Sequence, residues 1–132
     1  MSNYIANVGI FNSEILNIKD RQPGLLTIGE LEYAGKAIEE ELAEFQEAHA
    51  NQDMIGAVDA AIDLTYFAFG FLYRMGLTSD QIIACCAAVH EANMAKAASR
   101  NVSKRVSGEV DAEKPDGWVG PEEAIGAILS GV

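Results

Sequence analysis

The sequence has little that would stabilise the chain covalently or carry it into a membrane. Its two cysteines, Cys85 and Cys86, are adjacent, and successive helical residues point about 100° apart, which is poor geometry for a disulfide. The start, MSNYIANVGIF, lacks a basic segment followed by an apolar one, and the apolar stretch LTYFAFGFLY is far short of a membrane span. We therefore expect reduced thiols, no membrane partner and a cytoplasmic protein, located in the host cytoplasm if the chain is viral.

Positive charge is also scarce. The chain has 9 Lys and Arg against 20 Asp and Glu, which gives a formal net charge of -11. Affinity for nucleic acid comes largely from Lys and Arg that neutralise phosphates, so we expect no nucleic-acid partner. A small polyphosphate is still compatible with an acidic protein when divalent cations invert the local field.

Alternation of apolar and polar residues is weak throughout, whereas a period near 3.6 recurs in four segments. These segments span roughly residues 3–18, 28–50, 54–75 and 79–98. The polar and basic stretch SRNVSKRVSGEVDAEKPDGW predicts a long loop, and GPEEAIGAILSGV predicts a short C-terminal helix. With 132 residues, nearly half of them apolar, the chain has the size of one globular domain. We predict a single all-α domain over residues 1–132, a bundle of four to five helices.

Local signals mark the ends of several helices. The segment TIGE has the pattern of a capping box, with Thr27 as the N-cap. Gly76 has the place of a C-cap glycine, and Thr78 or Ser79 has that of the next N-cap. Pro121 is expected at the first position of the last helix, where the missing N–H has no helical partner to lose.

An acidic cluster fills EEELAEFQEA, residues 39–48, which contains five glutamates. At about 100° per residue, Glu41 falls within the apolar arc of its helix and Glu44 at the edge, whereas Glu40 points away. The members of this arc are Leu31, Ala34, Ala37, Ile38, Leu42, Phe45, Ala48 and His49. Glutamate-rich helix faces are usually only solvated, and the cluster alone favours that interpretation.

The next helix shifts this balance, because it carries two aspartates among apolar residues. Asp59 and Asp63 are at positions i and i+4, so they share a face, and like charges at this spacing repel. An ionised carboxylate in apolar surroundings costs on the order of several kcal/mol unless it is paired. Antiparallel helices would place Glu41 and Glu44 opposite the aspartates, where Mg²⁺ or Mn²⁺ would compensate the charges. With the aspartates included, the pattern is thus equally compatible with two interpretations, a metal site or a solvated face.

Polar residues also continue the apolar stripe of the fourth helix, at His90, Asn93 and Lys96. A single residue of this kind is usually satisfied in the core. Three together, followed by Arg100, are typical of donors that meet a ligand. His90 and Asn93 would recognise a base or a sugar, and Lys96 would contact phosphate.

The chain resembles a known family in four segments, EEELAEFQEA, VDAAIDLTYFAFGFLYRMGL, VHEANMAK and KPDGWVGPEEAIGAIL. In this order they resemble the all-α nucleoside triphosphate pyrophosphohydrolases, the MazG-like and phosphoribosyl-ATP pyrophosphohydrolase-like superfamily, in its compact phage or bacterial form. Together the segments cover most of residues 30–129. Each segment alone is weak, but the ordered set is fairly specific.

The signature of that superfamily is Glu-Glu-x-x-Glu on one helix and Glu-x-x-Asp on the next. The first half is matched by Glu40, Glu41 and Glu44. The second half departs, because an alignment on Asp63 puts Ala60 at the glutamate and an alignment on Asp59 puts Gly56 there. One usual ligand is therefore missing in either register, and which aspartate is the main ligand stays open.

The resemblance implies hydrolysis of a nucleoside triphosphate between its α and β phosphates, by two or three Mg²⁺ or Mn²⁺ ions. The metal ligands would be Glu41, Glu44, Asp59 and Asp63. Glu40 is the candidate general base for the attacking water. Among the possible substrates we predict (d)GTP, because Asn and backbone groups suit the donor and acceptor edge of guanine. The resemblance also implies a homodimer or homotetramer, with the apolar third helix at an interface.

The loop and its tryptophan acquire roles from the same resemblance. Three cations would close over the phosphates: Lys104, Arg105 and Lys114. Trp118 is expected to pack the last helix rather than to stack on a base.

Three alternatives stay open. The same fold would serve phosphoribosyl-ATP in histidine synthesis. A di-iron bundle would need Glu-x-x-His pairs, and the sequence has none. A non-catalytic oligomerisation or regulatory module would leave the acids as a solvated face, so it would bind no Mn²⁺ and would tolerate Asp63→Asn.

Overall fold

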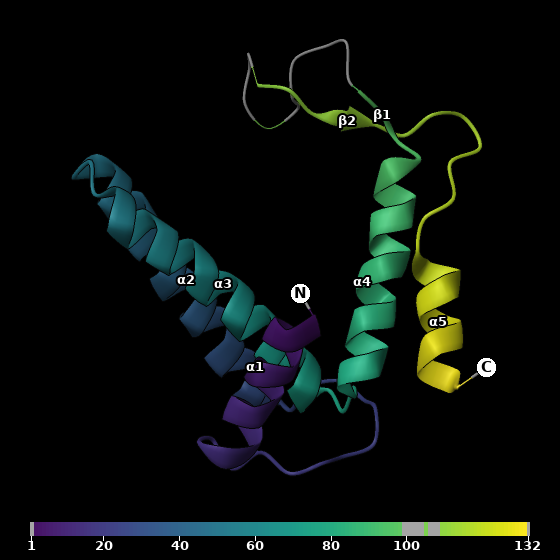
Figure 1. The fold of residues 1–132 in the computed structure, drawn as a ribbon, viewed down its shortest axis with the longest axis horizontal. Helices are drawn as coiled ribbons and strands as arrows, with labels where there is room; N and C mark the ends of the chain where they lie inside the picture. Colours follow the sequence, from purple (N-terminus) through teal and green to yellow (C-terminus); the bar gives the residue numbers. More distant parts are fainter. Residues whose placement is uncertain (1, 99–104, 106–108, 132) are drawn as a thin grey trace. The chain divides into compact units, whose positions relative to one another are not determined.

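The structure is a computed structural model that describes residues 2–98, 105 and 109–131. Within these residues its helices are α1 (Ser2–Glu14), α2 (Ile28–Ala50), α3 (Met54–Arg74), α4 (Ser79–Met94) and α5 (Glu122–Ser130). Two short strands, β1 (Ala97–Ala98) and β2 (Ala112–Glu113), pair antiparallel between α4 and α5. The predicted all-α class is confirmed (Figure 1). The strand pair was not predicted, and β2 lies inside the segment that was expected to be a loop.

The chain divides into two compact units. The first unit, Met1–Ile82, contains α1, α2, α3 and the start of α4. The second unit, Ile83–Val132, contains the rest of α4, the strand pair and α5. The four predicted metal ligands all belong to the first unit, and the predicted substrate-binding residues all belong to the second. The single domain expected over residues 1–132 stays a prediction.

In the first unit, α1 packs against α3 through fully buried apolar residues and a close contact with a tyrosine. Ile5 and Val8 have no exposed surface. The hydroxyl of Tyr73 on α3 donates a hydrogen bond to Ile5 O at 2.8 Å. Gly9 permits this approach, because a Cβ there would lie 2.7 Å from the Tyr73 ring. The contact fixes α1 against the C-terminal half of α3.

Three helix ends in the first unit are followed by a residue in the left-handed backbone conformation: Asn17 after α1, Gln52 after α2 and Gly76 after α3. α1 ends at Glu14, earlier than the predicted residue 18. The reason is Asn17, which has a φ of 57° and lets the chain turn back, so that Ile18 N donates to Asn12 O at 2.9 Å. Gly76 follows the C-cap of α3 with a φ of 87°, a position where glycine is common.

Three helix starts show the predicted capping signals in different degrees. At α2, Glu30 N donates to Thr27 Oγ1 and Thr27 N donates to the Glu30 carboxylate, each at 3.1 Å, so the capping box is confirmed. Thr78 and Gln81 make the same reciprocal pair of hydrogen bonds at the start of α4. Pro121 stands one residue before α5 instead of inside it.

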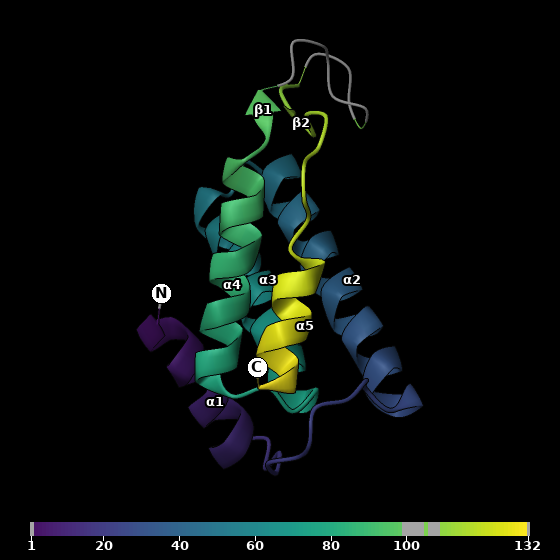
Figure 2. The same ribbon diagram turned by 90° about the vertical axis from the view of Figure 1, so that its right-hand side faces the viewer.

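α2 and α3 lie side by side as a helical hairpin (Figures 1 and 2). The buried residues at their contact are small: Ala34, Ala37 and Ala48 on α2, and Ala57 and Ala60 on α3. Leu31 and Leu42, which belong to the same apolar arc, are by contrast 64% and 45% exposed in this chain by itself. Small side chains permit close approach of helix backbones, which is why the alanine flank of the arc, with Glu41 on it, faces α3.

α3 has the length and composition of a membrane span, with a mean hydropathy of 1.5 over an 18-residue window. The expectation that no stretch reaches that length is therefore wrong. Within the described chain only 17% of this window is buried. A core helix of a soluble protein meets the same criterion, and Asp59 and Asp63 would be costly inside lipid. The criterion is thus weak support for a span.

The second unit is held by the tryptophan that precedes α5. Trp118 Nε1 donates a hydrogen bond to Ala92 O of α4 at 2.7 Å. α5 runs alongside α4 in both views (Figures 1 and 2). α4 itself ends at Met94 rather than near residue 98, because β1 begins at Ala97. These contacts agree with the expected packing role of Trp118.

Candidate active site

The first unit has a cavity of about 390 Å³ that is partly open to solvent, lined by α1, α2 and α3 and by Leu16 just after α1. Glu41 of α2 and Asp63 of α3 contribute carboxyl groups to its wall, and Arg74 contributes a guanidinium. Asp63 and Arg74 are about 16 Å apart along the axis of α3, at a rise of about 1.5 Å per residue. The cavity thus has an acidic end and a basic end, and its volume suits a small molecule.

Glu41 is the acid on which the acidic end depends. Its side chain is half-buried, and among the described residues its buried Oε2 atom has no hydrogen-bond partner. The pKa of Glu41 is raised to about 7, mainly by burial. A hydrogen bond with Glu44 and the negative charges of Glu44, Asp63 and Asp59 raise it further. Glu41 therefore holds a charge that its surroundings do not compensate.

Asp63 shares these surroundings. Burial raises the pKa of Asp63, and the charges of Asp59 and Glu44 raise it further. Glu44 and Asp59 are themselves exposed. The fold therefore brings the four predicted carboxyl groups into electrostatic contact, with Glu41 and Asp63 in the cavity wall and the other two at more exposed places.

The remaining glutamates of the cluster are solvated. Glu39, Glu40 and Glu47 are exposed, and none of them belongs to the cavity wall. Glu40, the candidate general base, directly precedes Glu41 and points away from the α2–α3 contact, as its helical position predicts. The five glutamates thus differ in environment although they are close in sequence.

The carboxyl groups fit a divalent cation in their chemistry. No group of three or more His, Cys, Asp or Glu side chains in the described part of the chain is arranged so that it could hold a metal ion. Carboxylates without a counter-ion repel one another or take up protons. The raised pKa values of Glu41 and Asp63 reflect this repulsion together with burial. Hard oxygen donors and the unpartnered Glu41 Oε2 suit Mg²⁺ or Mn²⁺. The metal ligands stay a prediction.

The packing of α3 leaves little room at the two positions where the signature glutamate would stand. Ala60 is only 2% exposed in the contact with α2, so a larger side chain has no room there. A Cβ on Gly56 would overlap the carboxylate of Asp53, the N-cap of α3. In this packing the pair Asp59 and Asp63 is what α3 offers to Glu41.

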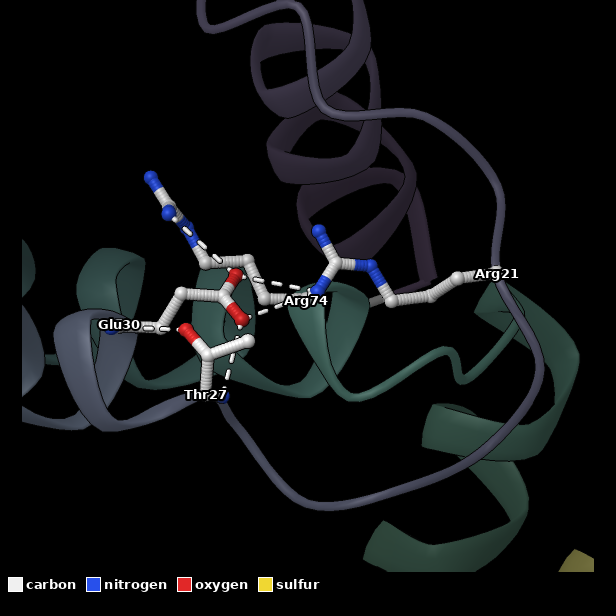
Figure 3. Close-up of polar contacts among 4 residues, drawn as sticks. All are labelled: Arg21, Thr27, Glu30 and Arg74. Atoms are coloured by element: carbon white, nitrogen blue, oxygen red, sulfur yellow. Dashed lines mark hydrogen bonds and ion pairs between the residues drawn. The ribbon is translucent and has the colours of Figure 1, made fainter.

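The basic end is built around one glutamate shared by two arginines (Figure 3). Arg21 Nη1 donates to both Glu30 oxygens at 3.0 and 3.1 Å, and Arg74 Nη1 lies 3.6 Å from Glu30 Oε2. The backbone N–H of Thr27, and then the Arg21 guanidinium, hold the pKa of Glu30 below its usual value. Arg74 also lies over the ring of Tyr33, at 4.9 Å from the centroid. These contacts fix Arg74 in the cavity wall.

Aromatic rings and one amide form the wall between the two ends. The aromatic residues are Phe11, Tyr33, Tyr66, Phe67 and Phe71. Asn12 is only 4% exposed, and its Nδ2 donates to Val8 O at 2.9 Å. Gly70 makes room for it, because a Cβ on Gly70 would lie 3.1 Å from Asn12 Nδ2. The middle of the cavity is therefore apolar, with a single buried amide in its wall.

The predicted substrate-binding residues of the second unit have local partners or are exposed. His90 and Asn93 are exposed on α4. Lys96 and Lys114 lie over the Trp118 ring, with Nζ at 5.2 and 5.0 Å from its centroid. Arg105 Nη1 pairs with Asp111 Oδ2 at 2.7 Å. Lys104 and Arg100 lie outside the described residues.

The cavity walls were not predicted, although the sequence carries a signal for them. On α3, the positions three, four, eight and eleven residues after Asp63 are Tyr66, Phe67, Phe71 and Arg74, which continue the face of the aspartate. On α1, Asn12 continues the buried stripe of Ile5 and Val8 at helical spacing. Such positions read equally well as ordinary core, so the spacing alone does not reveal a cavity.

Comparison with known families identifies a match over most of the helical part of the chain. The family model described as phosphoribosyl-ATP pyrophosphohydrolase matches residues 12–93, more than half of the chain. The matched range contains Asn12, Arg74 and all four carboxyl residues at the acidic end of the cavity. A search of curated proteins gives no match to this chain.

Proposed function

The chain belongs to the phosphoribosyl-ATP pyrophosphohydrolase family, and we propose that it hydrolyses a nucleoside triphosphate between the α and β phosphates. The products are the nucleoside monophosphate and pyrophosphate. Nucleotide pyrophosphohydrolase activity is what the family suggests, and the substrate and the metal requirement are the steps proposed beyond it. The observation that carries the proposal is the pair of uncompensated acids, Glu41 and Asp63, at one end of an aromatic cavity.

The metal part of the proposal rests on the same four acids. After a rearrangement of their side chains, Glu41 and Asp63 in the wall, with Glu44 and Asp59 beside them, would hold two or three Mg²⁺ or Mn²⁺ ions. Bound there, the ions supply neutralisation of the phosphates and a lower pKa for the attacking water. Enzymes of this superfamily commonly use divalent metals.

Glu40 is the proposed general base. It is exposed to solvent, and it directly precedes Glu41 in α2. In the proposed step, Glu40 takes the proton of a water whose oxygen forms a bond with the α phosphorus. The bond between that phosphorus and the bridging oxygen breaks, and pyrophosphate leaves with the electron pair. Six residues of the second unit stay candidates for substrate contacts: His90, Asn93, Lys96, Lys104, Arg105 and Lys114.

The test of the reaction is product analysis. The full chain is incubated with each common NTP and dNTP plus Mg²⁺ or Mn²⁺ in ¹⁸O-labelled water, and the products are identified by mass spectrometry. We expect pyrophosphate and a monophosphate that carries the label, because the attack is on the α phosphorus. Orthophosphate, or label in the pyrophosphate, would refute the proposed bond cleavage. No turnover together with no Mn²⁺ binding would favour the non-catalytic module.

Phosphoribosyl-ATP is the second candidate substrate, because the matching family model carries its name. The reaction is the same bond cleavage on a larger substrate. A direct competition between phosphoribosyl-ATP and the preferred dNTP, followed by the ratio of kcat/KM values, distinguishes the two.

We also propose a homodimer or homotetramer assembled through the exposed apolar residues of α3. These are Met54, Ile55, Val58 and Ile62, with exposed fractions of 75%, 84%, 49% and 50%. A surface of this kind is typical of a covered interface rather than of a free one. Light scattering coupled to gel filtration should give a multiple of 14.1 kDa. Ile55→Asp should reduce that mass, whereas Leu25→Asp, at a loop residue that is 89% exposed, should not.

A further inference from the structure

The middle of the cavity carries more chemistry than phosphate hydrolysis needs. The rings of Phe11 and Tyr66 meet edge to face, with their centroids 5.4 Å apart. The rings of Phe67 and Phe71 are stacked, with their centroids 6.1 Å apart. Aromatic side chains in a cavity of about 390 Å³ suit a planar ring system. Stacking of a nucleobase on such rings is worth about 1–3 kcal/mol per base. The acidic end would take the phosphates, so the base of a nucleotide falls in this middle part.

Asn12 is placed to read the edge of that base. It is 4% exposed and lies against Gly70, about 10 Å from Asp63 along α3. Its Nδ2 uses one hydrogen for Val8 O, which leaves one amide hydrogen and the Oδ1 acceptor. A donor beside an acceptor complements the pairing edge of every common base. Asn12 therefore favours a base over another planar group but does not choose among bases.

Arg74 would discriminate among the bases, because a guanidinium group only donates hydrogen bonds. A base amino group that faced Arg74 would set donor against donor, whereas a carbonyl oxygen or ring nitrogen would accept. Arginine pairs in this way with O6 and N7 of guanine. A phosphate group at the same place would stand beside the Glu30 carboxylate, 3.6 Å from Arg74 Nη1, and would be repelled. A neutral oxygen adds no such repulsion.

We infer that the cavity is a base pocket selective for nucleotides with a carbonyl oxygen at position 6 of a purine or position 4 of a pyrimidine. Guanine fits best, and uracil and thymine share the same oxygen edge. Asn12 and Arg74 are the specificity-determining residues. The inference rests on the proposed function for the reaction that follows binding, but the binding of the base does not require that reaction.

The choice of base is tested with Arg74→Met and the matched control Arg21→Met. Both arginines contact Glu30, but only Arg74 belongs to the wall of this cavity. With Mg²⁺ present, the wild-type chain should prefer dGTP, dUTP and dTTP over dATP and dCTP in kcat/KM. Arg74→Met should lower kcat/KM for the first three by roughly 10- to 100-fold. The values for dATP and dCTP should change by less than about 3-fold, and Arg21→Met should keep the preference.

The pocket itself is tested without metal or turnover. The ¹⁵N-labelled full chain is titrated with deoxyguanosine and with deoxyadenosine, and the side-chain amide signals are followed by NMR. Asn12→Leu identifies the Asn12 signal, and Asn7→Leu, at an exposed residue of the same helix, is the control. We expect deoxyguanosine to shift the Asn12 signal and deoxyadenosine to shift it less.

Gly70→Ala provides the test if Asn12→Leu does not fold. Alanine is favoured over glycine inside a helix, and its methyl group would stand 3.1 Å from Asn12 Nδ2 and narrow the pocket. It should weaken deoxyguanosine binding by about 10-fold or more while the chain stays folded.

The outcomes separate this inference from the proposed reaction. If no dNTP is hydrolysed but deoxyguanosine still shifts Asn12, the reaction is wrong and the pocket stands. If dNTPs are hydrolysed with a base preference that Arg74→Met leaves unchanged, the reaction stands and the pocket inference is overturned. A strong preference for phosphoribosyl-ATP that Arg74→Met abolishes would also overturn it, because Arg74 would then bind a second phosphate.

Discussion

Two places in the chain differ in how their charges are compensated, one in the second unit and one at the acidic end of the first unit. In the second unit, Arg105 pairs with Asp111 at 2.7 Å, and two lysines lie over the ring of Trp118. In the first unit, Glu41 and Asp63 are brought next to further acids instead of next to cations, and burial raises the pKa of both. These three cations of the second unit thus have local partners, as Glu30 of the first unit has in its two arginines. The charges at the acidic end of the first unit are not compensated in this way.

This difference indicates which part of the chain is the better candidate for a ligand-binding site. Residues close in sequence compensate each other without help from the fold, as Arg105 and Asp111 do. Carboxyl groups from two separate helices meet only because the alanine contact of α2 and α3 holds them there. A fold that keeps such charges together at a cost is typical of a functional site. The comparison therefore favours the first unit as the place of chemistry.

The largest expected effect is the loss of activity on removal of the uncompensated charge. Glu41→Gln should lower kcat/KM for the preferred dNTP on the order of 1,000-fold, because several kcal/mol of metal-based stabilisation disappear. Pyrophosphate release measures this loss. Glu47→Gln, at an exposed residue of the same helix, is the matched control and should keep full activity. Equal activity of the two variants would show that the acidic end is not the metal site.

A second effect concerns stability and pH in the absence of divalent cations. The pKa of Glu41 is about 7 in the folded chain against a usual value of 4.5, so the folded state binds more protons than the unfolded state between these values. Stability should therefore fall as the pH rises from about 4.5 to about 7. The raised pKa of Asp63 acts in the same direction. Thermal unfolding at pH 5.5 and pH 8, without added metal, measures this difference.

Two additions sharpen the pH experiment. Glu41→Gln should reduce the pH dependence and should raise the Tm at pH 8, because an amide cannot acquire the unfavourable charge. Mn²⁺ should raise the Tm of the wild-type chain at pH 8 more than that of the variant. A wild-type Tm that rises from pH 5.5 to pH 8 without metal would contradict the uncompensated charge.

A smaller effect is expected from the cations of the second unit. If Lys96 contacts a phosphate of the substrate, Lys96→Met should raise KM about 5-fold with little change in kcat, roughly 1 kcal/mol of screened attraction. Lys36→Met, an exposed lysine of the first unit paired with Glu32, is the control. If Lys96→Met does not change KM at low salt, Lys96 does not contact the substrate, and its contact with the Trp118 ring is its remaining role.

The smallest effect is structural and confined to the second unit. Trp118→Phe removes the hydrogen bond from Nε1 to Ala92 O and should destabilise the packing of the last segment by about 1 kcal/mol. Hydrogen exchange should become faster in α5, while the amides of α2 and α3 stay protected. Loss of activity without faster exchange would instead assign Trp118 to the substrate.

The helices could be predicted because their signals are local. The capping box at Thr27, the glycine after α3 and the N-cap at Thr78 depend on residues within a few positions, and all three are found in the structure. The end of α1 was missed, because Asn17 takes a left-handed conformation that many asparagines do not take. β1 and β2 were missed because a two-residue pairing leaves almost no periodic signal.

The candidate site was predictable in its acids and not in its walls. Glu41, Glu44, Asp59 and Asp63 were chosen because charge on an apolar helix face needs compensation, and the fold brings them into electrostatic contact. Asn12 and Arg74 were not chosen. A buried amide on α1 and an arginine at the end of α3 have no common pattern until the two helices pack together.

By itself the sequence determined the helices, their caps and the placement of acids on apolar faces, because helical geometry fixes which residues share a side. It did not determine which flank of α2 would meet α3. Only the tertiary structure decided that the alanines would be buried and that Leu31 and Leu42 would stay exposed, since close approach of two backbones requires small side chains. That choice carries Glu41 into the wall of a cavity, where its charge remains uncompensated.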